Sequence, residues 1–177
     1  MRVKKTKFKG LKVISGINYH DSRGFFREIY RDKILRPYKP IFWCVSKSKK
    51  NVLRGLHLQK NNSQAKFVSV LKGKILDVVL DLRSNSKTFC KYFKIELSQS
   101  NSKSLMIPKG FAHGFLGLDK ENIVLYSNDN YRSKNDEIGI KWNDSKVNIN
   151  WGKKKIIISN KDSKNISLNE YLKIIKK

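Results

Sequence analysis

Apolar and polar residues alternate over many short stretches of this 177-residue chain, a pattern typical of strands with one buried face. The clearest case covers residues 66–83, where an apolar run at 67–71 and an alternating run at 75–82 flank Lys72-Gly73. A lysine followed by a glycine between two such runs is typical of a tight turn. We therefore predict a β-hairpin over residues 66–83.

The second strand of this hairpin carries two carboxylates among apolar residues. Strand alternation places one set on one face, Ile75, Asp77, Val79 and Asp81, and the other set on the opposite face, Leu76, Val78, Leu80 and Leu82. Similar patterns predict further strands at residues 7–17, 25–30, 41–46, 92–97, 104–107, 122–127 and 155–159, and a turn running into a strand at 108–115. Residues 32–38 fit a short helix or a loop, and only residues 168–175 have helical spacing. We predict an all-β fold, a sandwich or jelly roll, in a single domain over residues 1–177 with a short C-terminal helix.

One predicted strand, residues 51–59, contains a histidine among apolar residues. Strict alternation would set Arg54 on one face with Leu56 and Leu58, and His57 on the other with Gly55. Histidine exchanges protons near neutral pH, so His57 is a candidate acid–base group. On this stretch alone, a structural histidine in the core is the more common alternative.

The net charge of +25 comes from 39 lysines and arginines against 14 acidic residues. Because the lysines are spread along the whole chain, we interpret them as a basic surface on an ordinary scaffold; a basic module that binds nucleic acid or another polyanion is the non-enzyme alternative. No apolar run has the length of a membrane span, and the N-terminus lacks the apolar core of a secretion signal. Two cysteines, Cys44 and Cys90, form no metal or disulfide spacing. We expect a cytoplasmic protein with free thiols and with no membrane or nucleic-acid partner.

A second histidine lies in Pro108-x-Gly110-x-x-His113, which resembles the second motif of the cupin superfamily, a double-stranded β-helix. The first cupin motif normally supplies a pair of histidines and a glutamate, whereas this chain offers His57 and then Gln59. A catalytic metal usually takes three protein ligands. We therefore expect no metal.

A metal-free site of proton transfer needs a base, a group that orients it, an acid and donors for the developing oxyanion. The chain offers His57 as base, Asp162 as orienting carboxylate, Tyr126 as acid, and Lys66 and Arg54 as cations. Each has an ordinary alternative: a core tyrosine, a turn aspartate, surface charges. Spacing alone does not bring these residues together.

Several blocks, in order, resemble the dTDP-4-dehydrorhamnose 3,5-epimerases of sugar-nucleotide biosynthesis. They are Asp21-x-Arg23-Gly24-Phe25-Phe26-x-Glu28, residues 46–59, Gln64-x-Lys66-x-Val68, residues 77–83, residues 107–115, Trp142-Asn143-Asp144 and Lys161-Asp162. The resemblance runs from about Asp21 to Asp162. It implies an enzyme that inverts C3 and C5 of a nucleotide-linked 4-keto-6-deoxy sugar, as a homodimer with a jelly-roll core and without metal or organic cofactor.

The resemblance also implies roles for individual residues. His57 corresponds to the general base, Asp162 to its carboxylate partner, Tyr126 to the general acid and Lys66 to the lysine beside the 4-keto oxygen. The positions that correspond to contacts with the sugar nucleotide are Arg23, Glu28, Arg54, Lys66, His113, Arg132, Glu137 and Lys161.

The chain departs from the family pattern at the expected nucleotide end. Phe42-Trp43-Cys44 stands where Gln-Asp-Asn is usual, and Arg132, next to Tyr131, stands where an aromatic residue stacks on thymine. Arginine can also stack on a base. An enzyme that acts at one carbon only, or on another nucleotide-linked 4-keto sugar, is therefore the alternative within the same class of reaction.

Overall fold

The computed structural model describes residues 1–152 and 155–175. It contains short strands and three short helices within these residues. In chain order they are β1 (Arg2–Lys5), β2 (Lys12–Ser15), β3 (Tyr19–Asp21), β4 (Gly24–Phe26), α1 (Asp32–Leu35), β5 (Phe42–Lys49), β6 (Leu53–Gln59), β7 (Lys66–Lys72), β8 (Lys74–Asp81), β9 (Tyr92–Ser98), β10 (Lys103–Ile107), β11 (Phe111–Gly117), β12 (Glu121–Asn128), β13 (Glu137–Gly139), α2 (Asn160–Ser163) and α3 (Leu168–Ile175). None of the described helices is long and apolar enough to cross a membrane.

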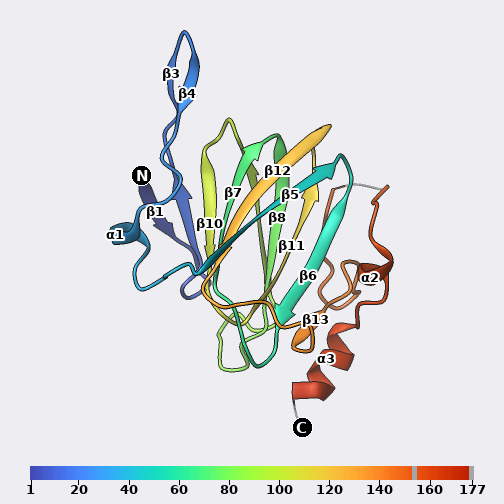
Figure 1. The fold of residues 1–177 in the computed structure, drawn as a ribbon. Coiled ribbons are helices and arrows are strands. Elements are labelled where there is room, and N and C mark those ends of the chain that lie inside the picture. Colours follow the sequence, from blue (N-terminus) through green and yellow to red (C-terminus); the bar gives the residue numbers. More distant parts are fainter. Residues whose placement is uncertain (153–154, 176–177) are drawn as a thin grey trace.

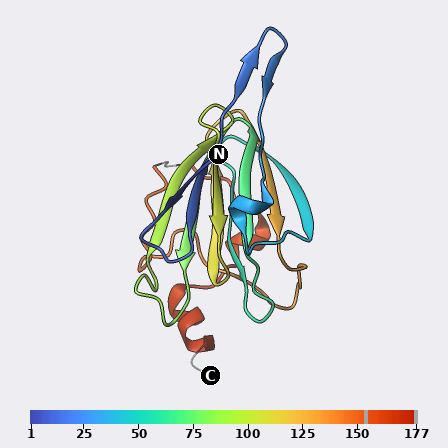
Figure 2. The same ribbon diagram turned by 90° about the vertical axis from the view of Figure 1, so that its left-hand side faces the viewer.

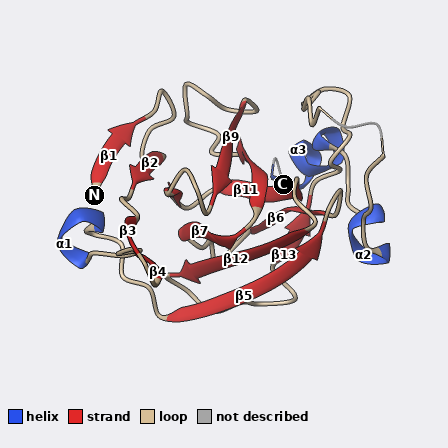
Figure 3. Cartoon of the chain, turned by 90° about the horizontal axis from the view of Figure 1, so that it is seen from above, coloured by secondary structure: helices blue, strands red, loops and turns tan. Residues whose placement is uncertain are grey.

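Two antiparallel sheets form the body of the molecule (Figures 1 and 3). The six-stranded sheet has the order β1-β2-β10-β7-β12-β5, and the five-stranded sheet has the order β13-β6-β11-β8-β9. Neighbours in each sheet are often far apart in sequence, as in a jelly roll. The predicted all-β fold with a short C-terminal helix is confirmed.

The hairpin predicted over residues 66–83 is wrong, because β7 belongs to the six-stranded sheet and β8 to the five-stranded sheet, so the chain crosses from one sheet to the other at Gly73. Both predicted strands are present, and they show how the sequence pattern builds the core. Ile75 and Val79 pack in the cluster between the two sheets, with Val68 and Val70 from β7. The alternate residues of β8 belong to a different cluster on the outer face of the five-stranded sheet. Both faces of β8 are therefore buried, and the predicted division of its side chains is confirmed.

The C-terminal part of the chain covers that outer face (Figure 1). Ile140, Trp151, Leu168 and Tyr171 pack there against the sheet. The strand predicted at residues 155–159 is wrong, because the backbone forms only an isolated bridge, Val52 to Ile157. The neighbouring isoleucines pack on the sheet without extending it, and the chain turns into α2, which the sequence did not reveal.

The N-terminal region also differs from the prediction. Of the strand expected at residues 7–17, only Lys12–Ser15 forms a strand, β2; residues 7–11 form the turn after β1, in which Phe8 and Leu11 are completely buried. The strand expected at 25–30 ends at Phe26 and pairs with β3. This hairpin projects from the body of the molecule (Figures 1 and 2), and the Phe26 side chain is 71% exposed. The short helix α1 follows as one of the two alternatives expected there.

Strand β6 does not alternate strictly. Arg54 pairs with Phe115 and His57 with His113, so three residue steps on β6 oppose two on β11. The extra residue forms a bulge, which turns Arg54 and His57 toward the same cavity. The predicted placement of these two residues on opposite faces is wrong for this reason.

Gly55 makes this bulge possible. Its φ is +109°, and a Cβ there would lie 2.6 Å from the carbonyl oxygen of His113. Any other residue would be strained and would push the two strands apart.

Candidate active site

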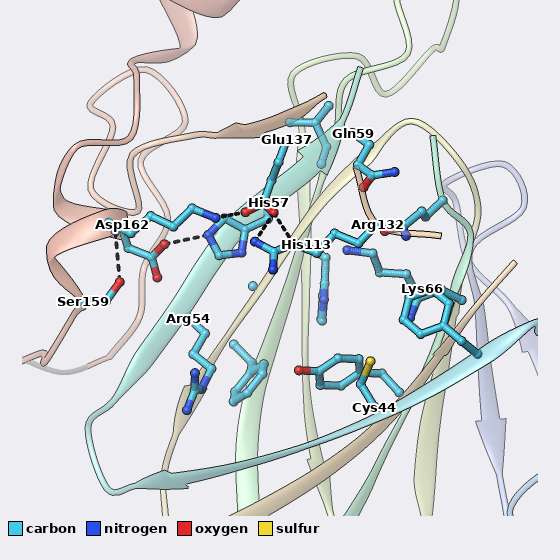
Figure 4. A pocket seen from close by; sticks show the side chains of 18 residues that line it. Cys44, Arg54, His57, Gln59, Lys66, His113, Arg132, Glu137, Ser159 and Asp162 are labelled. Atoms are coloured by element: carbon cyan, nitrogen blue, oxygen red, sulfur yellow. Dashed lines mark hydrogen bonds and ion pairs between the residues drawn. The ribbon is translucent and has the colours of Figure 1, made fainter. Parts of the chain in front are cut away.

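A cavity of about 400 Å³ lies between the two sheets, at the end where β6 and β11 meet the C-terminal segment. One wall comes from β6 and β11 of the five-stranded sheet, and the other from β5, β7 and β12 of the six-stranded sheet. In Figure 4, Asp162 and His57 lie on one side of the cavity, whereas Lys66 and Cys44 lie across from them. The cavity is therefore lined by groups from both sheets and from α2.

His57 and Asp162 form an imidazole–carboxylate pair. Nε2 of His57 lies 2.6 Å from Oδ1 of Asp162, which is 105 residues later in the chain. An ionised carboxylate only accepts hydrogen bonds, so Nε2 carries the proton and Nδ1 is the free basic nitrogen. The sequence expectation that Asp162 orients His57 agrees with this geometry.

Two further hydrogen bonds hold Asp162 in place, one to its carboxylate and one to its backbone. Its Oδ2 accepts a hydrogen bond from the backbone N–H of Gly55 at 3.2 Å, and its backbone N–H is capped by Ser159 Oγ at 3.1 Å. Burial raises the pKa of Asp162, but the hydrogen bond and charge of His57, with smaller contributions from Gly55 and Lys161, outweigh burial and lower it overall. Asp162 is therefore an ionised, fixed partner for the imidazole at neutral pH.

A second imidazole–carboxylate pair lies beside the first. His113 is the register partner of His57, and its Nε2 lies 2.8 Å from Oδ2 of Asp77. Asp77 is completely buried and His113 is 8% exposed. The alternating pattern predicted that Asp77 shares a face of its strand with Ile75 and Val79, but no function was predicted for it.

Lys66 and Tyr126 enter the cavity from the six-stranded sheet. Burial lowers the pKa of Lys66, and the negative charges of Glu137 and Asp77 oppose this shift. Within the described residues, the Lys66 ammonium makes no ion pair or hydrogen bond. Tyr126 pairs with Cys44 on β5 and with Val68 on β7. Both side chains are thus available to a molecule in the cavity.

The rim of the cavity carries three cations, two of which share one carboxylate. Glu137 accepts a hydrogen bond from Nε of Arg132 at 2.6 Å and forms an ion pair with Lys161. Burial raises the pKa of Glu137, but its bonds to Lys161 and Arg132 lower it overall. Arg54 extends along the mouth of the cavity, bound to Ser48 Oγ at 2.8 Å. The rim therefore suits an anionic ligand.

Gln59, which stands where a cupin would carry a second histidine, holds a loop. Its Nε2 donates to the carbonyls of Asn62 and Tyr131, at 2.6 and 3.2 Å, and its Oε1 accepts from the Ser133 N–H at 2.6 Å. Tyr131 in this loop stacks on Phe42 of β5, with ring centroids 5.7 Å apart and planes 13° apart. Phe42, which departs from the family pattern, thus forms an aromatic pair with Tyr131 beside the cavity, a contact that the sequence did not predict.

Two expected ligand residues lie outside the cavity of the same chain. Arg23 forms an exposed ion pair with Asp21 at the tip of the β3–β4 hairpin, and Glu28 pairs with Arg31. All the other predicted site residues line the cavity: His57, Tyr126, Asp162, Lys66, Arg54, His113, Arg132, Glu137 and Lys161.

Among the described residues, no three His, Cys, Asp or Glu side chains are grouped as a metal site requires. The two imidazoles of the cavity are instead bonded to carboxylates. The expectation of a metal-free, cofactor-free site stays a prediction.

The fold and the cavity together define a jelly-roll protein with an acid–base site. A family model described as dTDP-4-dehydrorhamnose 3,5-epimerase matches residues 5–170. A protein of that name from Shigella flexneri is 38% identical over 168 residues, which are 92% of this chain and 93% of the relative. The chain belongs to this family of enzymes.

Solved structures agree with this assignment. The crystal structure of the protein of that name from Elizabethkingia anophelis has a TM-score of 0.89 and 39% identity, with 96% of this chain and 97% of that chain covered. A dTDP-6-deoxy-D-glucose-3,5-epimerase from Legionella pneumophila in complex with dTDP-4-keto-L-rhamnose has a TM-score of 0.90 and 36% identity, with 95% and 93% covered.

Proposed function

We propose that this enzyme inverts C3 and C5 of dTDP-4-dehydro-6-deoxyglucose and so forms dTDP-4-dehydrorhamnose. The observation that carries the proposal is the His57–Asp162 pair, which faces a cavity that also holds Lys66 and Tyr126. A 4-keto group acidifies the carbons on both sides of it, so a single base near the ketone can act at C3 and at C5.

The geometry supports the following steps. Nδ1 of His57 takes the proton from the carbon, and the electron pair of the C–H bond moves into the ketone to give an enolate. Lys66 stabilises the enolate oxygen as a cation held in a half-buried site. Tyr126 then donates a proton to the carbon as the enolate returns to the ketone.

The positions of the two residues account for inversion. His57 belongs to β6 in the five-stranded sheet, and Tyr126 belongs to β12 in the six-stranded sheet. A sugar ring between these walls would lose its proton on one face and receive a proton on the other. A second abstraction by His57 and a second proton return by Tyr126, at the other carbon, complete the double inversion.

We assign the nucleotide end to the rim. Arg54 and Lys161 are placed to contact the diphosphate, and His113, Glu137 and Arg132 to contact the rest of the sugar nucleotide. The planar base of the nucleotide would stack on the pair formed by Phe42 and Tyr131. Such stacking does not depend on which base is present.

We further propose a homodimer in which the β3–β4 hairpin of one chain reaches the site of the other. This arrangement would bring Arg23 and Glu28 to a ligand that they do not meet within one chain, and it would cover the exposed Phe25 and Phe26. A molar mass of one chain by light scattering at micromolar concentration would contradict it.

We also propose that residues 1–177 act as one domain and that the enzyme works in the cytoplasm. The core between the sheets takes residues from Phe8 to Val124, and the C-terminal segment packs on one of those sheets. Cys44 and Cys90 are free thiols, which suits a reducing compartment.

The test is proton NMR of dTDP-4-dehydro-6-deoxyglucose with the enzyme in D₂O. We expect deuterium at C3 and C5 together with the signals of the inverted sugar. Exchange and inversion at one carbon would support the single-centre alternative, which the altered rim at Phe42 and Arg132 motivates. No exchange at either carbon would contradict the proposed reaction.

A further inference from the structure

The proton-transfer steps above do not involve the His113–Asp77 pair. Its hydrogen bonding is nevertheless unusual for a pair that only stabilises the fold. Asp77 is completely buried, and among residues 1–152 and 155–175 its Oδ1 has no hydrogen-bond partner. A buried carboxylate oxygen without a partner costs free energy of folding. A carboxylate kept under these conditions needs a reason other than stability.

Asp81 provides a comparison on the same strand and the same face. It is also completely buried, but its oxygens accept from Arg83, Ser86 and Thr88 at 2.6 to 2.8 Å. Asp81 thus has the bonding expected of a structural carboxylate. In the part of the chain that the structure describes, the Asp77 carboxylate is bonded only to His113.

We propose that Asp77 is a positioning residue for the epimerisation: its carboxylate fixes the His113 ring and balances the positive charge of Lys66, so that both side chains stay oriented toward the substrate oxygen. This inference rests on the proposed reaction. Asp77 itself does not line the cavity, so it would act only through these two neighbours.

The fixing of His113 follows from the hydrogen bond. Because the Asp77 carboxylate only accepts, Nε2 of His113 carries a proton and Nδ1 is the ring nitrogen left for a ligand. The 2.8 Å contact comes from β8, the sheet neighbour of β11, so the ring is held by a rigid element. A pre-oriented group loses less entropy when it contacts the transition state.

The balancing of Lys66 follows from the charges around it. Glu137 on β13 and Asp77 on β8 are the negative groups that oppose the effect of burial on the Lys66 pKa, with a smaller contribution from Cys44 on β5, while Arg132 acts in the opposite direction. Glu137 is already shared by two cations of the rim. The other titratable groups that line the cavity are His57, His113, Tyr126, Arg54, Lys161 and Asp162.

The first experiment compares Asp77→Asn with Asp81→Asn. Both replace a buried carboxylate of β8 with the amide of the same shape, but only Asp77 contacts a cavity residue. Removing the carboxylate behind a metal-bound imidazole typically costs about 10- to 100-fold, and we expect a fall of that order in the kcat of Asp77→Asn with little change in KM. Asp81→Asn should keep kcat.

The pH profile separates positioning from loss of structure. Without the charge of Asp77 the ammonium form of Lys66 is less favoured, so the alkaline limb of the kcat profile should move to lower pH in Asp77→Asn and stay in place in Asp81→Asn. If the two variants give superimposable profiles, the proposal is wrong.

The second experiment needs neither a variant nor activity. Long-range ¹⁵N–¹H NMR of the wild-type imidazoles should show His113 protonated at Nε2 across neutral pH. A neutral His113 with its proton on Nδ1 would overturn the proposal even in an active enzyme. If instead the wild type exchanges no substrate proton while His113 is protonated at Nε2, the proposed reaction fails and the fixing of His113 by Asp77 stands.

Discussion

His57 and His113 are register partners on β6 and β11, and the Nε2–H of each donates a hydrogen bond to an aspartate. The His57 side chain is 28% exposed and its carboxylate comes from α2, outside the sheets. The His113 side chain is 9% exposed and its carboxylate comes from the neighbouring strand. The same type of histidine–aspartate pair therefore occurs twice, once at the open wall of the cavity and once inside the sheet.

This difference indicates a division of labour. A base must reach the substrate and exchange its proton, which the open pair allows. The enclosed pair is restricted in motion and better suited to hold a charge or a ligand in place. The predictions below test this division, beginning with the largest expected effect on turnover.

Replacement of His57 by alanine should abolish both epimerisation and deuterium exchange. His113 on the same wall is enclosed in the sheet and bonded to Asp77, so we do not expect it to replace His57. General acid–base groups are typically worth about 10²- to 10⁴-fold in rate. NMR in D₂O measures both signals, and circular dichroism controls for folding. Near-normal turnover would place the base elsewhere and remove the contrast between the two pairs.

Tyr126→Phe removes the hydroxyl from the opposite wall and keeps the ring. His57 can still abstract the proton and return one to the same face, so we expect residual deuterium exchange with inversion reduced by about 10²- to 10⁴-fold. The ratio of exchange to inversion is the quantity to measure. Equal losses of the two would argue against a separate acid on that wall.

Asp162→Asn should reduce turnover less than loss of His57 itself. The amide can donate to Nε2, which would place the ring proton on Nδ1 and leave no basic nitrogen toward the substrate. We expect a fall of kcat of about 100-fold or more, by analogy with the carboxylate of hydrolase triads. Recovery of normal kcat in this variant would show that His57 does not depend on Asp162.

Asp81→Asn should affect stability and leave kcat unchanged. Burial raises the pKa of Asp81, but its bonds to Arg83, Ser86 and Thr88 lower it to about 2. Since the folded pKa lies below the unfolded one, the carboxylate stabilises the fold at pH above about 4, by about 2 kcal/mol. This contribution is lost as the pH falls from about 4 to about 2.

Urea unfolding at several pH values measures this effect. The difference in the free energy of unfolding between wild type and Asp81→Asn should be largest near neutral pH and should shrink toward pH 2. A constant difference over that range would show that the charge of Asp81 does not stabilise the fold.

The sequence predicted the parts that depend on local pattern. The alternation in β8 gave both of its faces correctly, because each face meets a different apolar layer. It could not reveal the bulge at Gly55, since a bulge is defined by pairing with β11. The approach of Asp162 to His57 likewise depends on how the C-terminal segment packs, and only the family resemblance pointed to it.

Other features depend on contacts that no local pattern encodes. Helix α2 has four residues, too few to give a periodic pattern. Asp77 shares a strand face with the apolar residues Ile75 and Val79, and a carboxylate in such a position is the sequence evidence that could have directed attention to it. Arg23 and Glu28 follow the family blocks, yet neither lines the cavity of its own chain, and each is paired with a neighbouring residue instead.

The 105 residues between His57 and Asp162 also bear on the order of events during synthesis. Every strand of both sheets precedes α2, so the sandwich can begin to form on the ribosome before its base has a carboxylate partner. The basic nitrogen of His57 is therefore fixed only after the last part of the fold has been made. Activity of a nascent chain would report on the docking of its C-terminal segment.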